Sequence, residues 1–186
     1  LPLQKSKAFI AALRSLSTAK SLREFEDTIS GVLDLPSPIG HDELVRNIGS
    51  VIAGFVQRPE IRLDIMAASI DYLESYYKPI IDRGKGMSFS QDLYGLGLLN
   101  QIAFIKTKDT KYFEAAKRYY SQGLALGPHR PQFLYAIFDI YRAEGDAERA
   151  RAISEQILTL WPGDDRVKKI LDELPRLEPQ PQAESA

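Results

Sequence analysis

The stretch "AKRYYSQGLALGP" (116–128) returns 34 residues later as "ARAISEQILTLWP" (150–162). Five of the thirteen aligned positions are identical, where ordinary residue usage predicts about one. Each copy carries apolar residues at helical spacing and ends at a proline, which stops a helix. The repeat therefore predicts an all-α fold built from helix–turn–helix units of one length. The identical pairs are Ala116/Ala150, Gln122/Gln156, Leu124/Leu158, Leu126/Leu160 and Pro128/Pro162.

A helix–turn–helix unit with a 34-residue period is the signature of tetratricopeptide repeats. The last full repeat runs from Pro131 to about Asp164. Its turn contains Gly145, where a left-handed residue ends the first helix. Ala150 then falls where the second helix crosses the first closely, so a small side chain is required. We expect a right-handed solenoid of antiparallel helix hairpins, closed by a C-terminal capping helix.

Helical spacing continues outward from this repeat over most of the chain, and no convincing strand pattern accompanies it. We expect one tetratricopeptide-like domain over 1–174, with degenerate repeats over 6–78, clearer repeats over 88–164 and a capping helix over 165–174. Residues 175–186 are rich in proline and poor in apolar side chains, which predicts a disordered tail. The expected helices are 6–16, 21–35, 41–56, 59–78, 88–106, 109–126, 131–144, 146–161 and 165–174.

The composition excludes several classes of protein. The 186 residues include 24 basic and 25 acidic side chains, so the net charge of −1 argues against a nucleic-acid partner. The absence of cysteine excludes disulfides and thiolate chemistry. No run approaches the roughly 18 apolar residues of a membrane span. Because the first residue is Leu1 rather than methionine, we interpret the chain as a fragment of a longer protein.

The residues that could bind a metal, a phosphate or a nucleic acid are explained more simply by ordinary structural roles. His41 lies at an expected helix start and His129 in a Gly-Pro turn, so neither indicates a metal site. The segment "DRGKG" (82–86) lacks the spacing of a phosphate-binding loop. Tyr119 and Tyr120 lie beside basic residues, but helical spacing places one in the core and leaves the other partly exposed. We therefore expect no catalytic residue, no metal and no cofactor in this chain. A small helical hydrolase or lyase is the enzyme alternative, and it lacks a converging set of acids or histidines.

Repeat solenoids bind partners along the concave face, which the first helix of each repeat forms. We expect a protein partner or a peptide in this groove, with Tyr135 and Arg142 as anchors because such side chains dominate binding hot spots. The alternative is that N-terminal helices cover its apolar part. The groove lacks the lysines and asparagines that hold a terminal carboxylate. The candidate residues are Gln132, Tyr135, Asp139 and Arg142 in the last repeat and Leu98, Ile102 and Ile105 in the one before.

Three segments carry a more specific resemblance: "PLQKSKAFIAALRSLS" (2–17), "KDTKYFEAA" (108–116) and "ALGPHRPQFLYAIFDIY" (125–141). Together they resemble the soluble C-terminal region of bacterial O-antigen ligase/polymerase-like membrane proteins, the superfamily of the lipopolysaccharide ligase and Wzy polymerases. The resemblance implies a non-catalytic interaction domain on the extracytoplasmic side of the inner membrane. In that family the glycan-transfer residues lie in the membrane part, so none is carried over to this chain.

The resemblance leaves one alternative open, a freestanding cytosolic tetratricopeptide scaffold or co-chaperone. Residues 1–20 contain four basic side chains and no acidic one, and basic residues beside a membrane span favour the cytoplasmic side. An ordinary solvated helix face explains the same pattern. The two placements predict different segments before Leu1. The extracytoplasmic domain would contact the membrane only through upstream membrane-spanning segments, whereas the cytosolic scaffold needs none.

Overall fold

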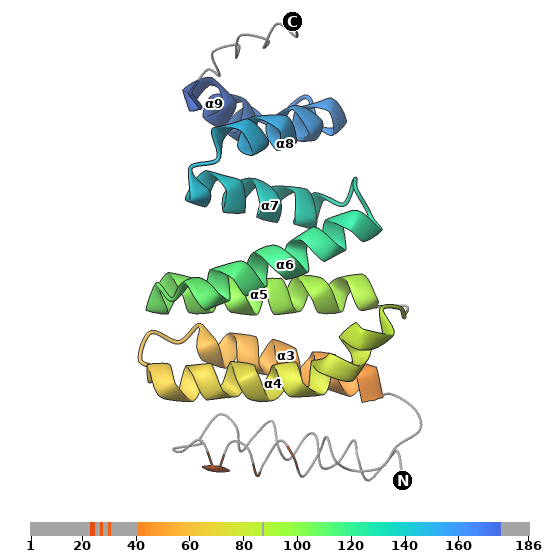
Figure 1. The fold of residues 1–186 in the computed structure, drawn as a ribbon, viewed down its shortest axis with the longest axis vertical. Helices are drawn as coiled ribbons and strands as arrows, with labels where there is room; N and C mark the ends of the chain where they lie inside the picture. Colours follow the sequence, from red (N-terminus) through yellow and green to blue (C-terminus); the bar gives the residue numbers. More distant parts are fainter. Residues whose placement is uncertain (1–22, 25–26, 28–29, 31–40, 87, 176–186) are drawn as a thin grey trace, which may run out of the picture. The chain divides into compact units, whose positions relative to one another are not determined.

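The computed structural model describes residues 23, 24, 27, 30, 41–86 and 88–175. Among these residues every regular element is an α-helix, which confirms the expected all-α class (Figure 1). The helix expected over 6–16 and the expected tail beyond Pro175 lie outside the described residues, and within the helix expected over 21–35 only residues 23, 24, 27 and 30 are described, all of them helical. The helices are α3 (His41–Val56), α4 (Leu63–Arg83), α5 (Phe89–Thr107), α6 (Thr110–Leu126), α7 (Pro131–Glu144), α8 (Ala147–Leu160) and α9 (Asp165–Glu173).

The chain divides into two compact units, and the boundary lies within α6, after Tyr119. In the first unit α3, α4 and α5 contact one another pairwise. The start of α6 joins them through Phe113, whose ring lies 4.9 Å from that of Phe104 on α5. The fully buried side chains that form this core include Val45, Ile52, Met66, Leu93, Ala103 and Ala116.

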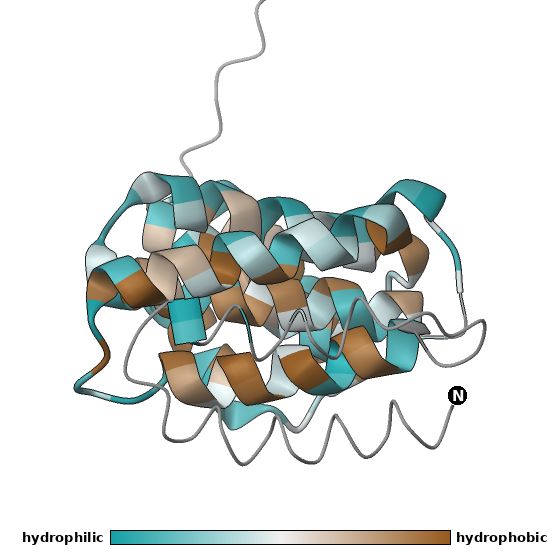
Figure 2. Ribbon diagram, turned by 90° about the horizontal axis from the view of Figure 1, so that it is seen from below, coloured by the Kyte–Doolittle hydropathy of each residue, from teal (hydrophilic) through white to brown (hydrophobic). Residues whose placement is uncertain are grey.

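In the second unit α7 packs against α8, and α8 packs against α9. The core of this unit includes one cluster of fully buried side chains, Leu134, Phe138, Ala150, Ile157 and Val167. Polar and apolar residues alternate round the helices in Figure 2, as burial of one face of each helix requires.

The turn between α7 and α8 shows why this hairpin forms. Gly145 has φ 73° and its N–H donates to the carbonyl of Arg142, while the N–H of Asp146 donates to the carbonyl of Tyr141. These two bonds form a Schellman motif, which satisfies the last carbonyls of α7. The carboxylate of Asp146 then accepts from the N–H of Arg149 at 3.0 Å and so caps the start of α8. Two adjacent residues thus end one helix and begin the next.

The bounds of α4 differ from those expected. Pro59 does not start this helix, which begins at Leu63, and Pro79 does not end it, because α4 continues to Arg83. Proline removes one backbone donor and is usually disruptive inside a helix. Here Ile80 lies beyond the proline and is only 2% exposed, so burial favours continuing the helix past it. The helix ends at Gly84, which has φ 64° and donates to the carbonyls of Ile80 and Ile81.

Helix α5 is buried on one broad side rather than on most sides, and Gln91, Gly95 and Ile105 are exposed. Its buried residues are Asp92, Leu93, Leu96, Gly97, Leu99, Asn100 and Ala103. It ends at Lys108, the only residue other than glycine with positive φ in the described part of the chain. The Lys108 N–H donates to the carbonyl of Phe104 at 2.8 Å. A lysine therefore occupies the left-handed position that glycine fills after α4 and α7.

Candidate functional site

The four residues expected on the interaction face of α7 differ in exposure. Gln132 and Arg142 are exposed, whereas Tyr135 and Asp139 are half-buried. Their spacing of three or four residues places them along one side of the helix. Each half-buried member contacts the start of α9, so this side of α7 partly faces α9.

Tyr135 is tied to the turn between α8 and α9. Its hydroxyl donates to the carboxylate of Asp164, and its ring lies 6.0 Å from that of Trp161 at 32°. Burial, and then the hydrogen bond to Asp164, raise the pKa of Tyr135 to about 12. The same bond, together with the Val167 N–H, lowers the pKa of Asp164. Tyr135 therefore holds α9 in place as well as presenting one side of its ring.

Asp139 pairs with two arginines. Its Oδ1 lies 3.4 Å from Arg142 on the same helix and 3.3 Å from Arg166 on α9. The Arg142 guanidinium also lies 5.4 Å from the centre of the Phe138 ring. All three charged side chains are at least one third exposed, so these pairs contribute little to stability. The charged groups of Asp139 and Arg142 on α7 therefore remain accessible to a partner.

The predicted residues of α5 lie in the first unit. Leu98 and Ile102 are half-buried, and Ile105 is 58% exposed. An exposed isoleucine on its own is common on protein surfaces. Leu98, however, lines a cavity that the sequence did not predict.

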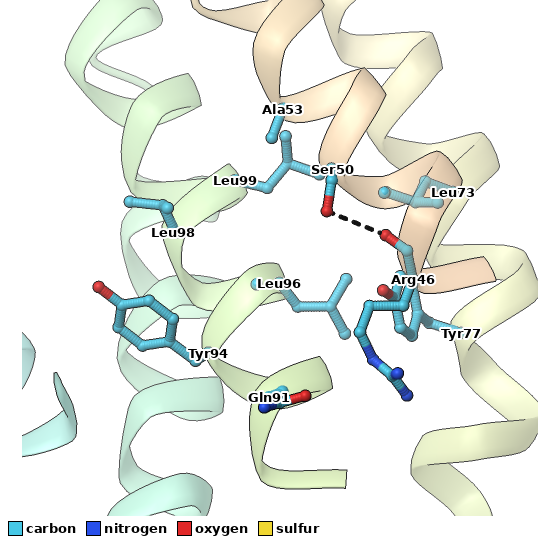
Figure 3. A pocket seen from close by; sticks show the side chains of 12 residues that line it. Arg46, Ser50, Ala53, Leu73, Tyr77, Gln91, Tyr94, Leu96, Leu98 and Leu99 are labelled. Carbon is cyan, nitrogen blue, oxygen red and sulfur yellow. Dashed lines mark hydrogen bonds between the residues drawn. The ribbon is translucent and has the colours of Figure 1, made fainter. Parts of the chain in front are cut away.

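This cavity lies between α3 and α5 and has a volume of about 290 Å³. Small residues of α3 (Gly49, Ser50, Ala53) face leucines of α5, and α4 contributes Leu73 and Tyr77. Figure 3 shows Arg46 and Gln91 toward one end, with Ala53, Leu98 and Leu99 toward the other. Ligand pockets of this size are typically apolar with a few placed polar groups. The cavity is thus a candidate binding site with one polar end.

A partly buried ion pair borders the polar end of the cavity. The Arg46 Nε donates to Asp92 Oδ1 at 2.8 Å, and Asp92 is only 2% exposed. Burial raises the pKa of the Asp92 carboxyl, and the hydrogen bond from Arg46 partly opposes this effect. Burial and the nearby Asp92 charge also raise the pKa of Tyr77. Tyr77 is therefore neutral, and the charge at this end belongs to Arg46 and Asp92.

A second polar network in the first unit connects α5 with α4 and α6. The Asn100 amide donates to Glu74 Oε1 at 2.8 Å and to the Leu96 carbonyl at 3.0 Å. The Tyr119 hydroxyl donates to the same Glu74 oxygen at 3.3 Å. These bonds join α4, α5 and α6, and they satisfy the buried amide of Asn100. We interpret this network as structural, because it links three helices of the first unit.

The other residues singled out by the sequence lie in ordinary positions. His41 is the first residue of α3, and His129 is exposed in the turn before α7. In the 82–86 segment, Gly84 caps α4 and Arg83 pairs with Asp42. The expectation for the tyrosine pair was partly wrong, because both Tyr119 and Tyr120 are buried, at 7% and 1% exposure. Both rings pack inside, and the Arg118 guanidinium lies 4.8 Å from the centre of the Tyr119 ring.

Within the described ranges, no group of three or more His, Asp or Glu side chains is arranged to hold a metal ion. No helix in this part of the chain is both long and apolar enough to cross a membrane. No family model matches the chain, and neither the curated proteins nor the solved structures gave a match.

Sequence reasoning missed the α3–α5 cavity and its ion pair. Arg46 and Asp92 are 46 residues apart, and no spacing rule connects positions on two separate helices. One signal was available in the sequence. Gly95 is one of two glycines inside α5 and the one that lines the cavity, and a glycine inside a helix often marks a packing or functional need.

Proposed function

We propose that this chain is a non-catalytic protein-interaction domain of the tetratricopeptide kind. The observation that carries the proposal is the burial of Ala116 and Ala150, which lie 34 residues apart and are both 0% exposed. The buried Ala150 suits the packing of α7 against α8, and Ala116 lies at the same position one 34-residue period earlier. The Schellman turn before α8 and the docked α9 support the same interpretation.

We further propose that the domain belongs to a membrane ligase or polymerase of O-antigen or another cell-surface polysaccharide, on the extracytoplasmic side. The support is the resemblance of segments 2–17, 108–116 and 125–141 to the C-terminal region of that superfamily. In this role the domain performs no transfer itself. It binds a partner protein or peptide through surface complementarity and so positions the membrane enzyme.

The α7 face provides the binding chemistry. Gln132 and Arg142 are exposed, and Tyr135 offers an aromatic surface already fixed by Asp164 and Trp161. A side chain that is ordered before binding loses less entropy on association than a free one. Arginine and tyrosine are also enriched among residues that dominate binding energy. A partner with an acidic group near an aromatic or apolar residue fits this combination.

Site-specific photo-cross-linking tests the interaction. A photoreactive phenylalanine is placed at Gln132 in the full-length protein in its own cells, and a matched one at Glu155, which is exposed on α8. We expect a discrete adduct from position 132 that Arg142→Glu weakens, and none from position 155. Adducts from both positions, or from neither, contradict the proposed face.

Membrane placement is tested separately by fractionation of the same cells. Recovery in the membrane fraction, with a tag at the C-terminus that external protease removes from spheroplasts, is expected for the proposed role. Recovery in the soluble fraction contradicts that role and favours the cytosolic scaffold or co-chaperone. In that case the cross-linking result still stands for an interaction domain.

A further inference from the structure

Gly95, which has no side chain, lines the cavity between α3 and α5 from the α5 side. Gly95 lies inside α5 and lines the cavity, and a Cβ atom built there meets nothing within 4 Å. Glycine inside a helix is unfavourable relative to alanine, so a packing need usually explains it. At Gly95 the described residues impose no such need. Gly95 is itself exposed, so it leaves the wall of the cavity open at this position, where a leucine side chain would add bulk.

The size and lining of this space suit an alkyl chain. An engineered apolar cavity of roughly 150 Å³ binds benzene, and this cavity is about twice that volume. Leu96, Leu98, Leu99 and Ala53 supply apolar surface on two facing helices. A single amino-acid side chain leaves part of such a volume empty, whereas a chain of roughly eight to ten carbons fills it.

The polar end determines the kind of head group. Arg46 uses Nε to bind Asp92, and no partner of its two Nη groups is found among the described residues. Two positive side chains (Arg46, Arg83) and three negative ones (Asp42, Glu43, Asp92) interact electrostatically here, for a net charge of −1. A further carboxylate is disfavoured by this balance. A neutral acceptor, such as an ester or amide carbonyl, can still accept from the Arg46 Nη groups.

We propose that the α3–α5 cavity binds a neutral single-chain acyl molecule, with its alkyl chain against the leucines of α5 and its ester or amide carbonyl at Arg46 and Gln91. This site does not depend on the proposed partner interaction, because it lies in the first unit and the α7 face lies in the second.

The direct test is a titration of the full chain with 1-octanoylglycerol below its micelle-forming concentration. Binding is measured by isothermal titration calorimetry and by mapping NMR chemical-shift changes. We expect one site with Kd of roughly 30–300 µM, in line with the efficiency of ligands of this size. The shifts should concentrate on α3 and α5. Octanoate should bind at least fivefold more weakly, and glycerol not at all. Absence of saturable binding, or shifts spread over all helices, overturns the proposal, and tighter binding of octanoate overturns the neutral head group.

Gly95→Leu is the decisive variant, and Gly54→Leu is its matched control. Gly54 is exposed on α3, has open space beyond its Cα and does not line the cavity. Both substitutions replace a helical glycine and should raise Tm or leave it unchanged. Only Gly95→Leu should weaken 1-octanoylglycerol binding, by more than tenfold. Equal affinity in both variants contradicts a ligand in the cavity.

Two further variants test the carbonyl contact. Arg46→Lys keeps the charge beside Asp92 but loses the planar donor groups, and Gln91→Ala changes an exposed side chain. We expect affinity for 1-octanoylglycerol to fall by about fivefold to tenfold in Arg46→Lys and by about threefold in Gln91→Ala, with Tm unchanged in Gln91→Ala. Unchanged affinity in both variants contradicts the placement of the head group.

Discussion

Gly123 shows how one residue without a side chain permits close helix packing. A Cβ atom at this position of α6 would lie 2.1 Å from Cε1 of Phe133 on α7, well inside van der Waals contact. Phe133 is itself fully buried. The absence of a methyl group therefore lets the Phe133 ring rest directly on the backbone of α6.

We predict that Gly123→Ala lowers the free energy of unfolding by about 2–3 kcal/mol through overpacking, despite the better helix propensity of alanine. Adding Phe133→Leu to this variant should recover part of the loss, because it removes the ring that the new methyl meets. Urea unfolding of the two single variants and the double variant checks this. Gly54→Ala, in open space, is the control and should be neutral or stabilising. A Gly123→Ala variant as stable as the parent contradicts the close contact.

Lys108 carries a different kind of local strain. Its φ of 60° places a side chain in the left-handed region, which costs about 1 kcal/mol for residues other than glycine. We predict that Lys108→Gly stabilises the chain by about 0.5–1 kcal/mol, as measured by thermal and urea unfolding. Lys111→Gly, one turn later inside α6, should instead destabilise by a similar amount. The same sign for both substitutions argues against a left-handed cap at position 108.

At the scale of the helix, prediction from sequence succeeded where the end signals are local. Pro131 at the first position and Gly145 after the last define α7, and its bounds match those expected. It failed for α4, because the burial of Ile80 beyond Pro79 is a tertiary effect that proline rules do not contain. The candidate face on α7 was predicted by register, but its ties to α9 depend on the position of a neighbouring helix.

Helix α9 is held at its C-terminal end by Arg151 on α8. The Arg151 guanidinium donates to the carbonyls of Leu174 at 3.0 Å and Pro175 at 3.3 Å, which are left without intrahelical partners. We predict that Arg151→Ala weakens the docking of α9 by about 1–2 kcal/mol. Hydrogen exchange over 165–174 should then quicken about tenfold, with little change in α4. Lys169→Ala, an exposed residue of α9, serves as the control and should change neither. Unaltered exchange in Arg151→Ala rules out this role for the arginine.

The Tyr135–Asp164 bond makes the attachment of α9 sensitive to alkaline pH. The folded pKa of Tyr135 is about 12, above the ordinary value near 10. The stabilising effect is therefore complete below pH 10 and is lost as pH rises from 10 to 12, because the unfolded chain releases this proton first. We predict that Tm of the parent falls more steeply across this range than Tm of Tyr135→Phe. Parallel pH profiles of the two proteins contradict the bond.

At the scale of the molecule, the 34-residue period predicted the helical class, because helical spacing is a local property of the sequence. It did not predict the cavity between α3 and α5. That space depends on how α3 and α4 pack against α5, and spacing rules within a single helix do not contain this information. The period also did not predict a division into two compact units within α6. Each unit carries one candidate surface, so the two can be tested independently.

The proposed repeat register depends on Ala150, which is fully buried among Leu134, Phe138, Ile157 and Val167. The most direct test compares Ala150→Trp with Ala152→Trp, since Ala152 is exposed two residues further along the same helix. Unfolding is followed by circular dichroism. We predict a loss of about 3 kcal/mol or more for Ala150→Trp through overpacking, and a change within about 0.5 kcal/mol for Ala152→Trp. An unchanged Tm for Ala150→Trp contradicts the close helix crossing and, with it, the register from which the interaction face was derived.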